Sequence, residues 1–492
     1  MPSTDRPDIL FITVDTMRRD CMAPYGPDLM PTATRLLAGG TAFDRAVAPA
    51  PWTGSSFGSI LSGLWPRRHG CMNHTPRRGG PTTRAPLADD VRLLSEMLHD
   101  SGYHTACCQG NYGFLGPGLG FARGFDEYFV WHWDTSKRLG SLGREVRWLG
   151  DALAHGHLFR HLAYAAFRLM GRSGRRFLQR RPPMSEGGTL VRQARRLLHR
   201  APDEQPVFLW VNLMDLHVPH TAPRKWMPPA EAPGGVKPFH LHPRTHLDEQ
   251  MTDADRAYVR KRYENSARYA DHCIASLLDR WPRRRGERPR LTVFASDHGE
   301  EFWDHGTDRA DPTFYNCGSG HGHTLFGELI HVPFIMHWPG MIAADRRVDQ
   351  LVSLVDLVPT LIDLLALDED TSAMVGRSLK PDVTGDAPAD GDRIVFADGL
   401  MYGPERRAAV SATHKLIRCP ETGEEQLFAW GLDDPGDTRD LIGSDAHAEV
   451  RERLSHALDA WNPLEAGGAP PRRLSPDEEA ALAERLGRLG YF

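Results

Sequence analysis

The stretch Ala50–Gly70, APWTGSSFGSILSGLWPRRHG, combines small residues with a short apolar run and is typical of a loop that enters a helix. Thr53 stands at or beside the expected N-cap, and Gly63 stands near the expected helix end. A side-chain oxygen there faces unpaired backbone N–H groups and the positive end of the helix dipole. The position suits an anion or a nucleophile that attacks one, although an ordinary helix cap is the simpler interpretation of this stretch alone.

The bulk composition sets broad limits on the protein. The 492 residues are enough for two domains or for one large α/β domain with an appendage. Hydrophobic residues make up 40% and charged residues 25%, as in a soluble globular protein, and the net charge of −5 indicates no nucleic-acid partner. The seven cysteines lack a C-x-x-C pair and predict no disulfide framework. No signal peptide or membrane-spanning run is visible, so we expect a cytoplasmic protein.

Apolar runs and helical periodicity alternate on both sides of the opening stretch. We expect buried strands at Ile9–Val14, Thr41–Val47, Tyr103–Cys108, Val207–Met214, Leu291–Ala295 and Val332–His337. We expect helices at Thr32–Ala38, Val91–His99, Asp253–Trp281 and Leu354–Leu365. This rhythm predicts an α/β fold with a large, mostly parallel sheet sandwiched by helices.

Two further regions complete the expected domain organisation. Short strands at 394–396, 408–418 and 426–430 predict a smaller antiparallel C-terminal subdomain, with a Pro- and Gly-rich linker at Pro381–Asp392. We therefore place the catalytic α/β domain at 1–380 and an α+β subdomain at 393–492.

A basic helical insertion is expected at 131–200. Residues 137–181 carry eleven Lys or Arg against two acids, interleaved with aromatic and aliphatic residues. This pattern fits peripheral membrane contact or a lid over an anionic substrate. A helical excursion packed on the core, with a solvated basic face, is the plainer interpretation.

Acidic residues end three of the expected strands, namely Asp15, Asp215 and Asp297, and His298 follows the last of them. The carboxyl ends of parallel strands share one edge of the sheet, so these side chains can meet although they are far apart in sequence. Two carboxylates, an imidazole and a hydroxyl suit Zn²⁺ or Mn²⁺ better than Mg²⁺. We predict a divalent-metal site at Asp15, Asp297 and His298, with the Thr53 oxygen as a further ligand that the metal activates.

Many segments together resemble the sulfatase family of the alkaline-phosphatase superfamily. They are FITVDTMRRD, SILSGLWPRRHG, GYHTACCQGN, GFARGFDEY, NLMDLHVPH, SDHGEEFWDHG, GHGHTLFGELIHVPFIMHWPG, VSLVDLVPTLIDLL and ATHKLIRCPETGEEQLF. The resemblance covers most of the chain except 131–200 and the C-terminal end. It implies an alkaline-phosphatase-like fold and metal ligands at Asp15, Asp297 and His298.

The nucleophile position departs from the sulfatase pattern. Sulfatases carry C-x-P-S-R or a serine version of it, whose first residue is oxidised to formylglycine. Thr53 stands at that position, with Ser55 and Phe57 at the proline and arginine positions. The methyl group on the threonine Cβ prevents oxidation to an aldehyde. Sulfatases also usually have asparagine where this chain has His298.

These departures resemble the phosphodiesterase and phosphonate-ester hydrolase branch with a threonine nucleophile. We therefore expect cleavage of a phosphodiester, phosphomonoester or phosphonate ester through a phosphothreonine intermediate at Thr53, or phosphotransfer. A small-molecule or lipid-headgroup phosphoester is the expected substrate.

The resemblance also implies roles for other residues. His217 or His321 would protonate the leaving group, Asn73 would contact a substrate oxyanion, and His323 would bind substrate or orient a neighbouring group. It favours one metal ion. A second ion held by Asp215, His217 and either His321 or His323 is the alternative, because two-metal sites are common in phosphoryl transfer.

Two other functions stay open at this point. One is a sulfuric-ester hydrolase that uses the unmodified threonine. The other is a non-catalytic scaffold that binds a membrane or a partner through the basic segment. The sequence leaves the organic portion of the substrate and the oligomeric state open.

Overall fold

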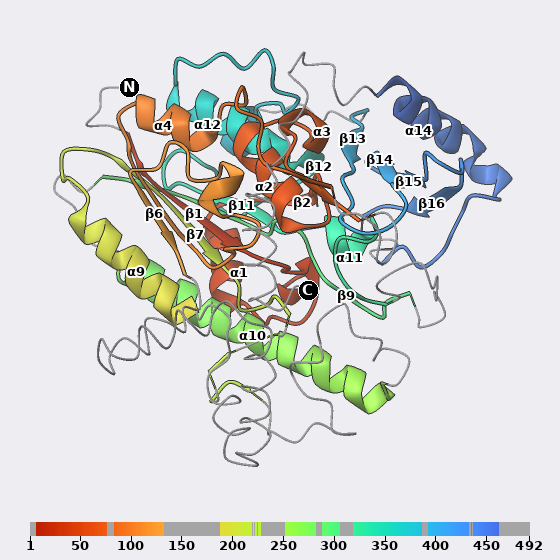
Figure 1. Cartoon of the computed structure of the whole chain (residues 1–492), viewed down its shortest axis with the longest axis horizontal. Helices are drawn as coiled ribbons and strands as arrows, with labels where there is room; N and C mark the ends of the chain where they lie inside the picture. Colours follow the sequence, from red (N-terminus) through yellow and green to blue (C-terminus); the bar gives the residue numbers. More distant parts are fainter. Residues whose placement is uncertain are drawn as a thin grey trace, which may run out of the picture.

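An eight-stranded sheet forms the centre of the molecule, with helices on both faces (Figure 1). The computed structural model describes residues 6–75, 83–131, 187–218, 220, 222–223, 225–227, 251–281, 288–305, 318–385, 392–431, 434 and 436–461. In spatial order the strands are β12 (Arg346–Ser353), β2 (Thr41–Val47), β11 (Phe334–His337), β8 (Arg290–Ala295), β1 (Asp8–Val14), β7 (Val207–Leu213), β5 (His104–Gln109) and β6 (Glu127–Val130). Within this sheet β11 runs antiparallel to both neighbours, and the other pairings are parallel. The predicted α/β class with a mostly parallel sheet is confirmed.

Helices cover the two faces of the sheet. One face carries α2 (Thr53–Ser62), α4 (Leu94–Asp100) and α12 (Leu357–Leu365), and the other carries α1 (Pro31–Gly39), α9 (Gly187–Arg200) and α10 (Asp253–Asp279). Strand β1 shows why the sheet is sandwiched, because Ile9 and Phe11 join the apolar core of the first face while Leu10 and Ile12 join that of the second. Every residue of β1 is buried, as expected for a parallel strand covered on both sides.

Shorter elements connect the core strands or lie near their carboxyl ends. They are α3 (Pro66–His69), β3 (Met72–His74), β4 (Thr83–Ala85), β9 (Glu301–Phe302), β10 (Ser319–Gly320), α11 (Gly327–Ile330), α13 (Lys380–Thr384) and 3-10 turns at Arg19–Cys21, Pro117–Leu119, Leu354–Asp356 and Asp445–His447. No helix in the part of the chain that the structure describes has both the length and the apolar character needed to cross a membrane.

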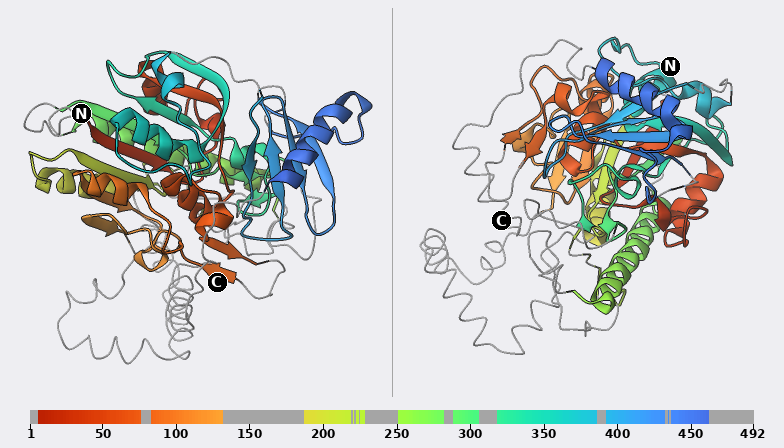
Figure 2. Two further views of the ribbon diagram at one scale, coloured as in Figure 1. Left: turned by 90° about the horizontal axis from the view of Figure 1, so that it is seen from above. Right: turned by 90° about the vertical axis from the view of Figure 1, so that its right-hand side faces the viewer.

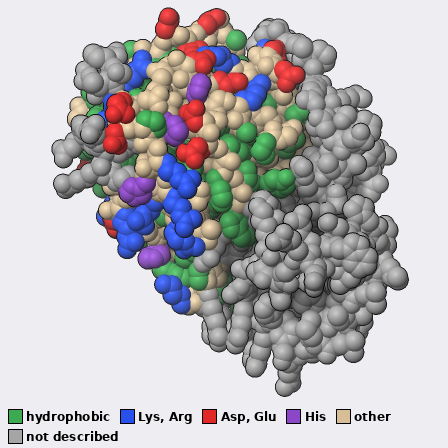
Figure 3. Space-filling model, turned by 60° about the vertical axis from the view of Figure 1, so that its left-hand side comes forward, with side chains coloured by type: hydrophobic (Ala, Val, Ile, Leu, Met, Phe, Trp, Pro, Cys, Tyr) green, Lys and Arg blue, Asp and Glu red, His purple; other side chains and the backbone are tan. Residues whose placement is uncertain are grey.

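Helix α9 lies at the C-terminal end of the predicted basic helical insertion, 131–200. Its buried residues, among them Leu190 and Leu197, pack in the core with α10, β5 and β7, so residues 187–200 belong to the sheet-covering layer. Its amphipathic pattern leaves Arg192, Arg196 and Arg200 exposed. The side of the molecule on which α9 lies in Figure 1 is turned forward in Figure 3, where Lys and Arg side chains gather. The basic segment 137–181 lies outside the described residues.

A four-stranded antiparallel sheet follows in the C-terminal part and lies beside the main sheet (Figure 2). It contains β13 (Val395–Ala397), β14 (Arg407–Val410), β15 (His414–Arg418) and β16 (Glu425–Ala429), and α14 (Ala448–Ala460) packs on it. The predicted small antiparallel unit is confirmed, but the strand expected over 408–418 is a hairpin of two strands. The domain limits 1–380 and 393–492 stay predictions.

The C-terminal sheet is tied to the core beside the start of α2. Arg67 forms ion pairs with Asp398 (Nε–Oδ2 2.7 Å) and Glu405 (Nη2–Oε2 2.7 Å). In the same segment, Gly399 O accepts a hydrogen bond from Trp52 Nε1 at 2.6 Å. Trp52 directly precedes α2, so the C-terminal segment fixes the approach to that helix.

Candidate active site

The carboxyl ends of β1 and β8 bring two of the predicted acids together. Thr13 of β1 pairs with Ala295 of β8, so Asp15 and Asp297 each follow that pair by two residues. The Ser296 hydroxyl holds the two chain ends in place, since it lies 2.8 Å from Val14 O and accepts the N–H of Met17 at 3.0 Å. The parallel register therefore sets the distance between the two carboxylates.

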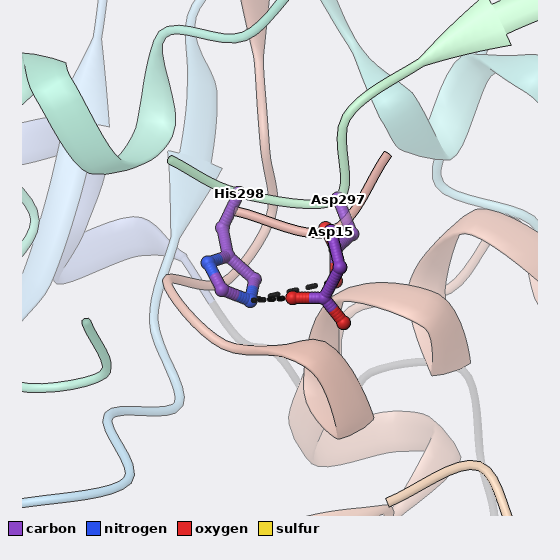
Figure 4. A group of neighbouring side chains, drawn as sticks. All are labelled: Asp15, Asp297 and His298. Atoms are coloured by element: carbon purple, nitrogen blue, oxygen red, sulfur yellow. Dashed lines mark ion pairs between the residues drawn. The ribbon is translucent and has the colours of Figure 1, made fainter. Parts of the chain in front are cut away.

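Asp15, Asp297 and His298 form a compact, fully buried group (Figure 4). The Nε2 atom of His298 lies 3.4 Å from Asp297 Oδ2 and 3.8 Å from Asp15 Oδ1. His298 Nδ1 donates to Gly299 O at 2.9 Å, which leaves the Nε2 lone pair directed at the two carboxylates. Among the described His, Cys, Asp and Glu residues, this set alone places three possible ligand atoms within 4.8 Å of one another.

The electrostatics of this group favour a bound cation. Burial, and then the neighbouring Asp15, raise the pKa of Asp297 well above its ordinary value. Peptide N–H groups nearby reduce that shift only in part, and both Asp297 oxygens and Asp15 Oδ1 meet no donor at hydrogen-bond geometry among the described residues. Burial and the adjacent His321 lower the pKa of His298 to about 3, so the imidazole is neutral. A neutral imidazole beside two uncompensated carboxylates is a donor set that Zn²⁺ or Mn²⁺ accepts.

Helix α2 presents Thr53 to this group. Trp52 occupies the N-cap position with an extended backbone, so Thr53 is the first helical residue rather than the cap, and Gly63 ends the helix in the left-handed conformation at φ 72°. The Ser56 hydroxyl donates to the backbone oxygen of Asp297 at 2.7 Å. This bond joins the first turn of α2 directly to the end of β8.

The Thr53 hydroxyl oxygen lies where a further metal ligand would lie. Its Oγ1 is 3.4 Å from Asp15 Oδ2 and 3.4 Å from His298 Nε2. A tetrahedral ion with bonds of about 2.0–2.1 Å has ligand atoms about 3.3–3.4 Å apart. The residues present therefore fit the divalent metal predicted from the sequence.

The small residues of α2 serve its packing against His69. Ser59 Oγ lies 3.1 Å from His69 Nε2, and that nitrogen lies 3.0 Å from Ser55 O. The other ring nitrogen accepts the N–H of Cys71 at 3.1 Å. Burial lowers the pKa of His69 to about 3. A β-carbon on Gly58 would stand 2.3 Å from the ring, so only glycine allows this close approach.

The two predicted catalytic histidines, His217 and His321, lie in a row of rings that ends at His298. The His321 ring centroid lies 4.6 Å from that of His298 and 5.0 Å from that of His217. His217 Nδ1 donates to Val218 O at 2.8 Å. His321 Nδ1 lies 3.2 Å from both carboxylate oxygens of Glu300, whose pKa burial raises to about 8. The histidines are thus held with their Nδ1 atoms occupied.

Other predicted residues are placed elsewhere. His323 pairs with Glu301 at 2.7 Å, and this contact outweighs the effect of burial and raises the pKa of His323. Asp215 Oδ1 accepts the N–H of Gly187 at 3.0 Å. Among the described residues, Asp215 and His217 do not join either His321 or His323 in a set of three ligand atoms within 4.8 Å, so the alternative second metal site is not assembled there. Asn73 is buried in β3, and no contact among the described residues joins its side chain to Thr53.

Sequence reasoning missed two residues of the site, Asn111 and Glu300. Asn111 Nδ2 lies 3.3 Å from Thr53 Oγ1 and 3.2 Å from Asp15 Oδ2. The sequence does contain a signal for Asn111, because this residue follows the end of β5 by two residues, at the edge of the sheet where the acids were expected. Glu300 follows His298 by two residues, but its contact with His321 depends on the β9–β10 pairing, which the sequence pattern does not show.

Comparison with known proteins identifies the family. The family model described as Sulfatase matches residues 7–367, which is most of the chain. The chain belongs to the sulfatase family. A second model, N-sulphoglucosamine sulphohydrolase, C-terminal, matches residues 322–462. Sulfatase-family enzymes generally depend on a divalent metal, in agreement with the buried donor set of Asp15, Asp297 and His298.

The relatives of this sulfatase-family chain share low sequence identity with it over long alignments. It is 22% identical to an arylsulfatase of Clostridium perfringens over 481 residues, and this aligned region covers 92% of each chain. It is 24% identical over 399 residues to a sulfatase of Formosa agariphila, which covers 74% of this chain and 70% of the relative. In fold it matches a phosphonate monoester hydrolase from Silicibacter pomeroyi with a TM-score of 0.65 and 21% identity, over 96% of this chain and 100% of that one.

The expectation of a phosphoester substrate is wrong on these comparisons. The relatives matched in sequence are named as sulfatases, whereas the phosphonate hydrolase is a match in fold alone. The methyl group of Thr53 excludes a formylglycine aldehyde, but it does not exclude a hydroxyl that attacks sulfur. The type of nucleophile therefore does not select phosphorus over sulfur, and what remains of the expectation is an ester hydrolase of the sulfatase family.

Proposed function

We propose that this chain is a metal-dependent sulfuric-ester hydrolase that uses the unmodified hydroxyl group of Thr53. The observation that carries this proposal is the position of Thr53 Oγ1 at the start of α2, 3.4 Å from both Asp15 Oδ2 and His298 Nε2. The arylsulfatase and sulfatase names of its relatives support sulfur as the reacting centre.

The metal would be held by Asp15, Asp297 and His298, with Thr53 Oγ1 as a further donor. Zn²⁺ and Mn²⁺ accept such a mixture of oxygen and nitrogen ligands. When bound, the cation supplies positive charge that favours the deprotonated hydroxyl and attracts the sulfate oxygens.

The side chains of this protein perform the remaining steps. Thr53 loses its hydroxyl proton to solvent, and its Oγ1 attacks sulfur in line with the leaving alcohol while the bond between sulfur and that alcohol oxygen breaks. The first N–H groups of α2 stabilise the charge on the sulfate oxygens. His217 or His321 donates a proton to the leaving oxygen. Water then attacks sulfur, gives a proton to the histidine that the first step left neutral, and releases sulfate from the Thr53 oxygen.

The Glu300 contact orients His321, one of the two histidines proposed as proton donors to the leaving group. The Glu300 carboxyl group on Nδ1 fixes the ring orientation and directs Nε2 away from Glu300. Asn73 and His323 as substrate contacts, membrane contact through 137–181 and a cytoplasmic location stay predictions. Co-sedimentation of the full chain with anionic liposomes tests the membrane contact, and cell fractionation tests the location.

The experiment compares an aryl sulfate with an aryl phosphodiester and an aryl phosphonate ester, using protein reconstituted with Zn²⁺ or Mn²⁺. We expect kcat/KM for the sulfate to equal or exceed the values for the phosphorus esters. Thr53→Ala should lower kcat/KM by at least ~10³-fold, because the nucleophile is lost. Thr53→Ser keeps the hydroxyl group and serves as the matched control that retains turnover.

A second readout follows the covalent step. Rapid quenching and mass spectrometry should show a sulfate group attached to Thr53, and turnover in ¹⁸O water should place the label in the released sulfate. Preference for a phosphorus ester, or unchanged turnover in Thr53→Ala, would contradict the proposed function.

A further inference from the structure

Asn111 is a buried amide at the reaction centre to which no role has so far been given. It follows β5 at the carboxyl edge of the sheet, and its side chain is buried. The Nδ2 atom lies between two acceptors, at 3.3 Å from Thr53 Oγ1 and 3.2 Å from Asp15 Oδ2. One amide group therefore contacts both the reacting hydroxyl and a predicted metal ligand.

The orientation of this amide is fixed by its own loop. Asn111 Oδ1 accepts the N–H of Phe114 at 3.0 Å, and the backbone oxygen of Asn111 accepts the N–H of Leu115 at 3.0 Å. Leu115 O in turn accepts bonds from Gln109 Nε2 at 3.0 Å and the Tyr128 hydroxyl at 2.7 Å. Because a backbone N–H must meet the amide oxygen, the NH₂ group must face Thr53 and Asp15.

We propose that Asn111 is a further catalytic residue of the proposed hydrolysis, a neutral donor that stabilises the Thr53 oxygen as negative charge develops on it. The inference rests on the proposed role of Thr53 as nucleophile. An amide has two N–H groups, so one can serve Thr53 Oγ1 while the other holds Asp15 Oδ2 in place. Since the donor is uncharged, it adds no cation that would repel a metal ion in the same site.

A fixed donor of this kind has a measurable effect on rate. It is placed before the reaction and needs no rearrangement when charge appears, and removal of one such donor elsewhere costs about 10²–10³ in kcat. The donor also limits the Thr53 hydroxyl to one rotamer, because Oγ1 must accept from Asn111 while it faces Asp15 and His298.

The kinetic test uses Asn111→Asp, which keeps an oxygen for the Phe114 N–H but removes the two N–H donors. We expect kcat to fall about 10²–10³-fold at saturating Mn²⁺, with KM near wild type. The melting temperature of the metal-free variant should fall, because a third buried carboxyl group then lies beside Asp15. Asn212→Asp is the matched control, since Asn212 is also a buried amide beside a threonine hydroxyl, Thr13, at 2.7 Å. A fall of less than about fivefold in Asn111→Asp would overturn the proposal.

A readout without turnover uses metal-free protein labelled with ¹⁵N-asparagine. The side-chain resonance that disappears in Asn111→Asp should shift in Thr53→Ala and stay in place in Thr13→Ala. An unshifted resonance in Thr53→Ala would overturn the proposal even if Thr53 is the nucleophile. If the wild type prefers a phosphorus ester, the proposed function fails. In that case the ratio of kcat for Asn111→Asp to kcat for the wild type, measured on that ester, still tests the role of Asn111.

Discussion

Two groups of buried acids in this molecule differ in their surroundings. Asp356, before α12, is fully buried and receives both guanidinium nitrogens of Arg393 at 2.7 Å and the N–H groups of Ser353 and Arg377 at 2.9 and 2.8 Å. Asp15 and Asp297 are equally buried, but the groups nearest to them are uncharged. The amide nitrogen of Asn111 lies 3.2 Å from Asp15, and the neutral imidazole of His298 lies 3.4 Å from Asp297.

The difference separates a structural acid from a functional one. A buried carboxylate is tolerated only when charge or hydrogen bonds replace the water it has lost. Asp356 obtains these from the chain itself, so it stabilises the fold. Asp15 and Asp297 obtain too few, so they destabilise the metal-free protein and favour binding of a cation at the edge of the sheet.

The largest expected effect is on turnover when the cation site is altered. Asp297→Asn removes one negative ligand, and it should lower kcat/KM on the order of 10³-fold because the metal supplies several kcal/mol of charge stabilisation. Dialysis against a chelator should reduce wild-type activity to a similar extent, and added Zn²⁺ or Mn²⁺ should restore it. Full activity after the metal is removed would show that the acids serve another purpose.

The second effect concerns stability rather than catalysis. Asp356→Asn breaks the buried pair with Arg393 and should lower the free energy of unfolding by about 3–5 kcal/mol, as measured by urea denaturation. Asp363→Asn is the control, since its pair with Lys380 is half exposed and should cost less than about 1 kcal/mol. If Asp356→Asn lowers the free energy of unfolding by less than about 1 kcal/mol, Asp356 does not stabilise the fold and does not differ from Asp297 in this way.

A smaller effect is expected where the C-terminal sheet meets α2. Arg67→Gln leaves Asp398, which is fully buried, with fewer donors, and it should cost about 1–3 kcal/mol in unfolding free energy. Trp52 donates to the adjacent Gly399, so we also expect a moderate fall in kcat, well below that of Asp297→Asn. Unchanged stability and turnover would show that this contact does not position α2.

The smallest effect is expected at the surface. Arg92 pairs with Glu369 and Asp100 with its side chain about half exposed. Exposed ion pairs contribute little, so Arg92→Gln should change the free energy of unfolding by less than about 1 kcal/mol and leave kcat/KM unchanged. A thermal melt and a single activity assay measure both quantities, and a larger loss would mean that screening by water is weaker than assumed.

The sequence predicted the core of the fold because its strands are continuous apolar runs. Ile9–Val14 and Thr41–Val47 were found with ends close to those of β1 and β2. The reversed direction of β11 was not predicted, because a short apolar run carries no information on strand direction. The packing of 187–200 on the sheet was not predicted, because the arginines of α9 hid its buried Leu190 and Leu197.

The part of the candidate site that was predicted from the sequence follows from one rule, that polar residues at the carboxyl ends of parallel strands lie together. Polar residues at strand ends located Asp15, Asp297 and His298, and a helix start located Thr53. Asp215 obeyed the same rule but bonds to Gly187 instead, because its surroundings depend on how α9 packs. Asn111 and Glu300 were missed since their roles depend on loop conformation, which composition and spacing do not specify.

The most direct test of the account measures the stability of wild-type protein and Asp297→Asn with and without metal. Removing one of two adjacent buried carboxyl groups should raise the melting temperature of the metal-free protein, because the repulsion with Asp15 is lost. Added Zn²⁺ or Mn²⁺ should raise the melting temperature of the wild type and have little effect on the variant. A metal-free variant less stable than the wild type, with an undiminished response to metal, would contradict the account.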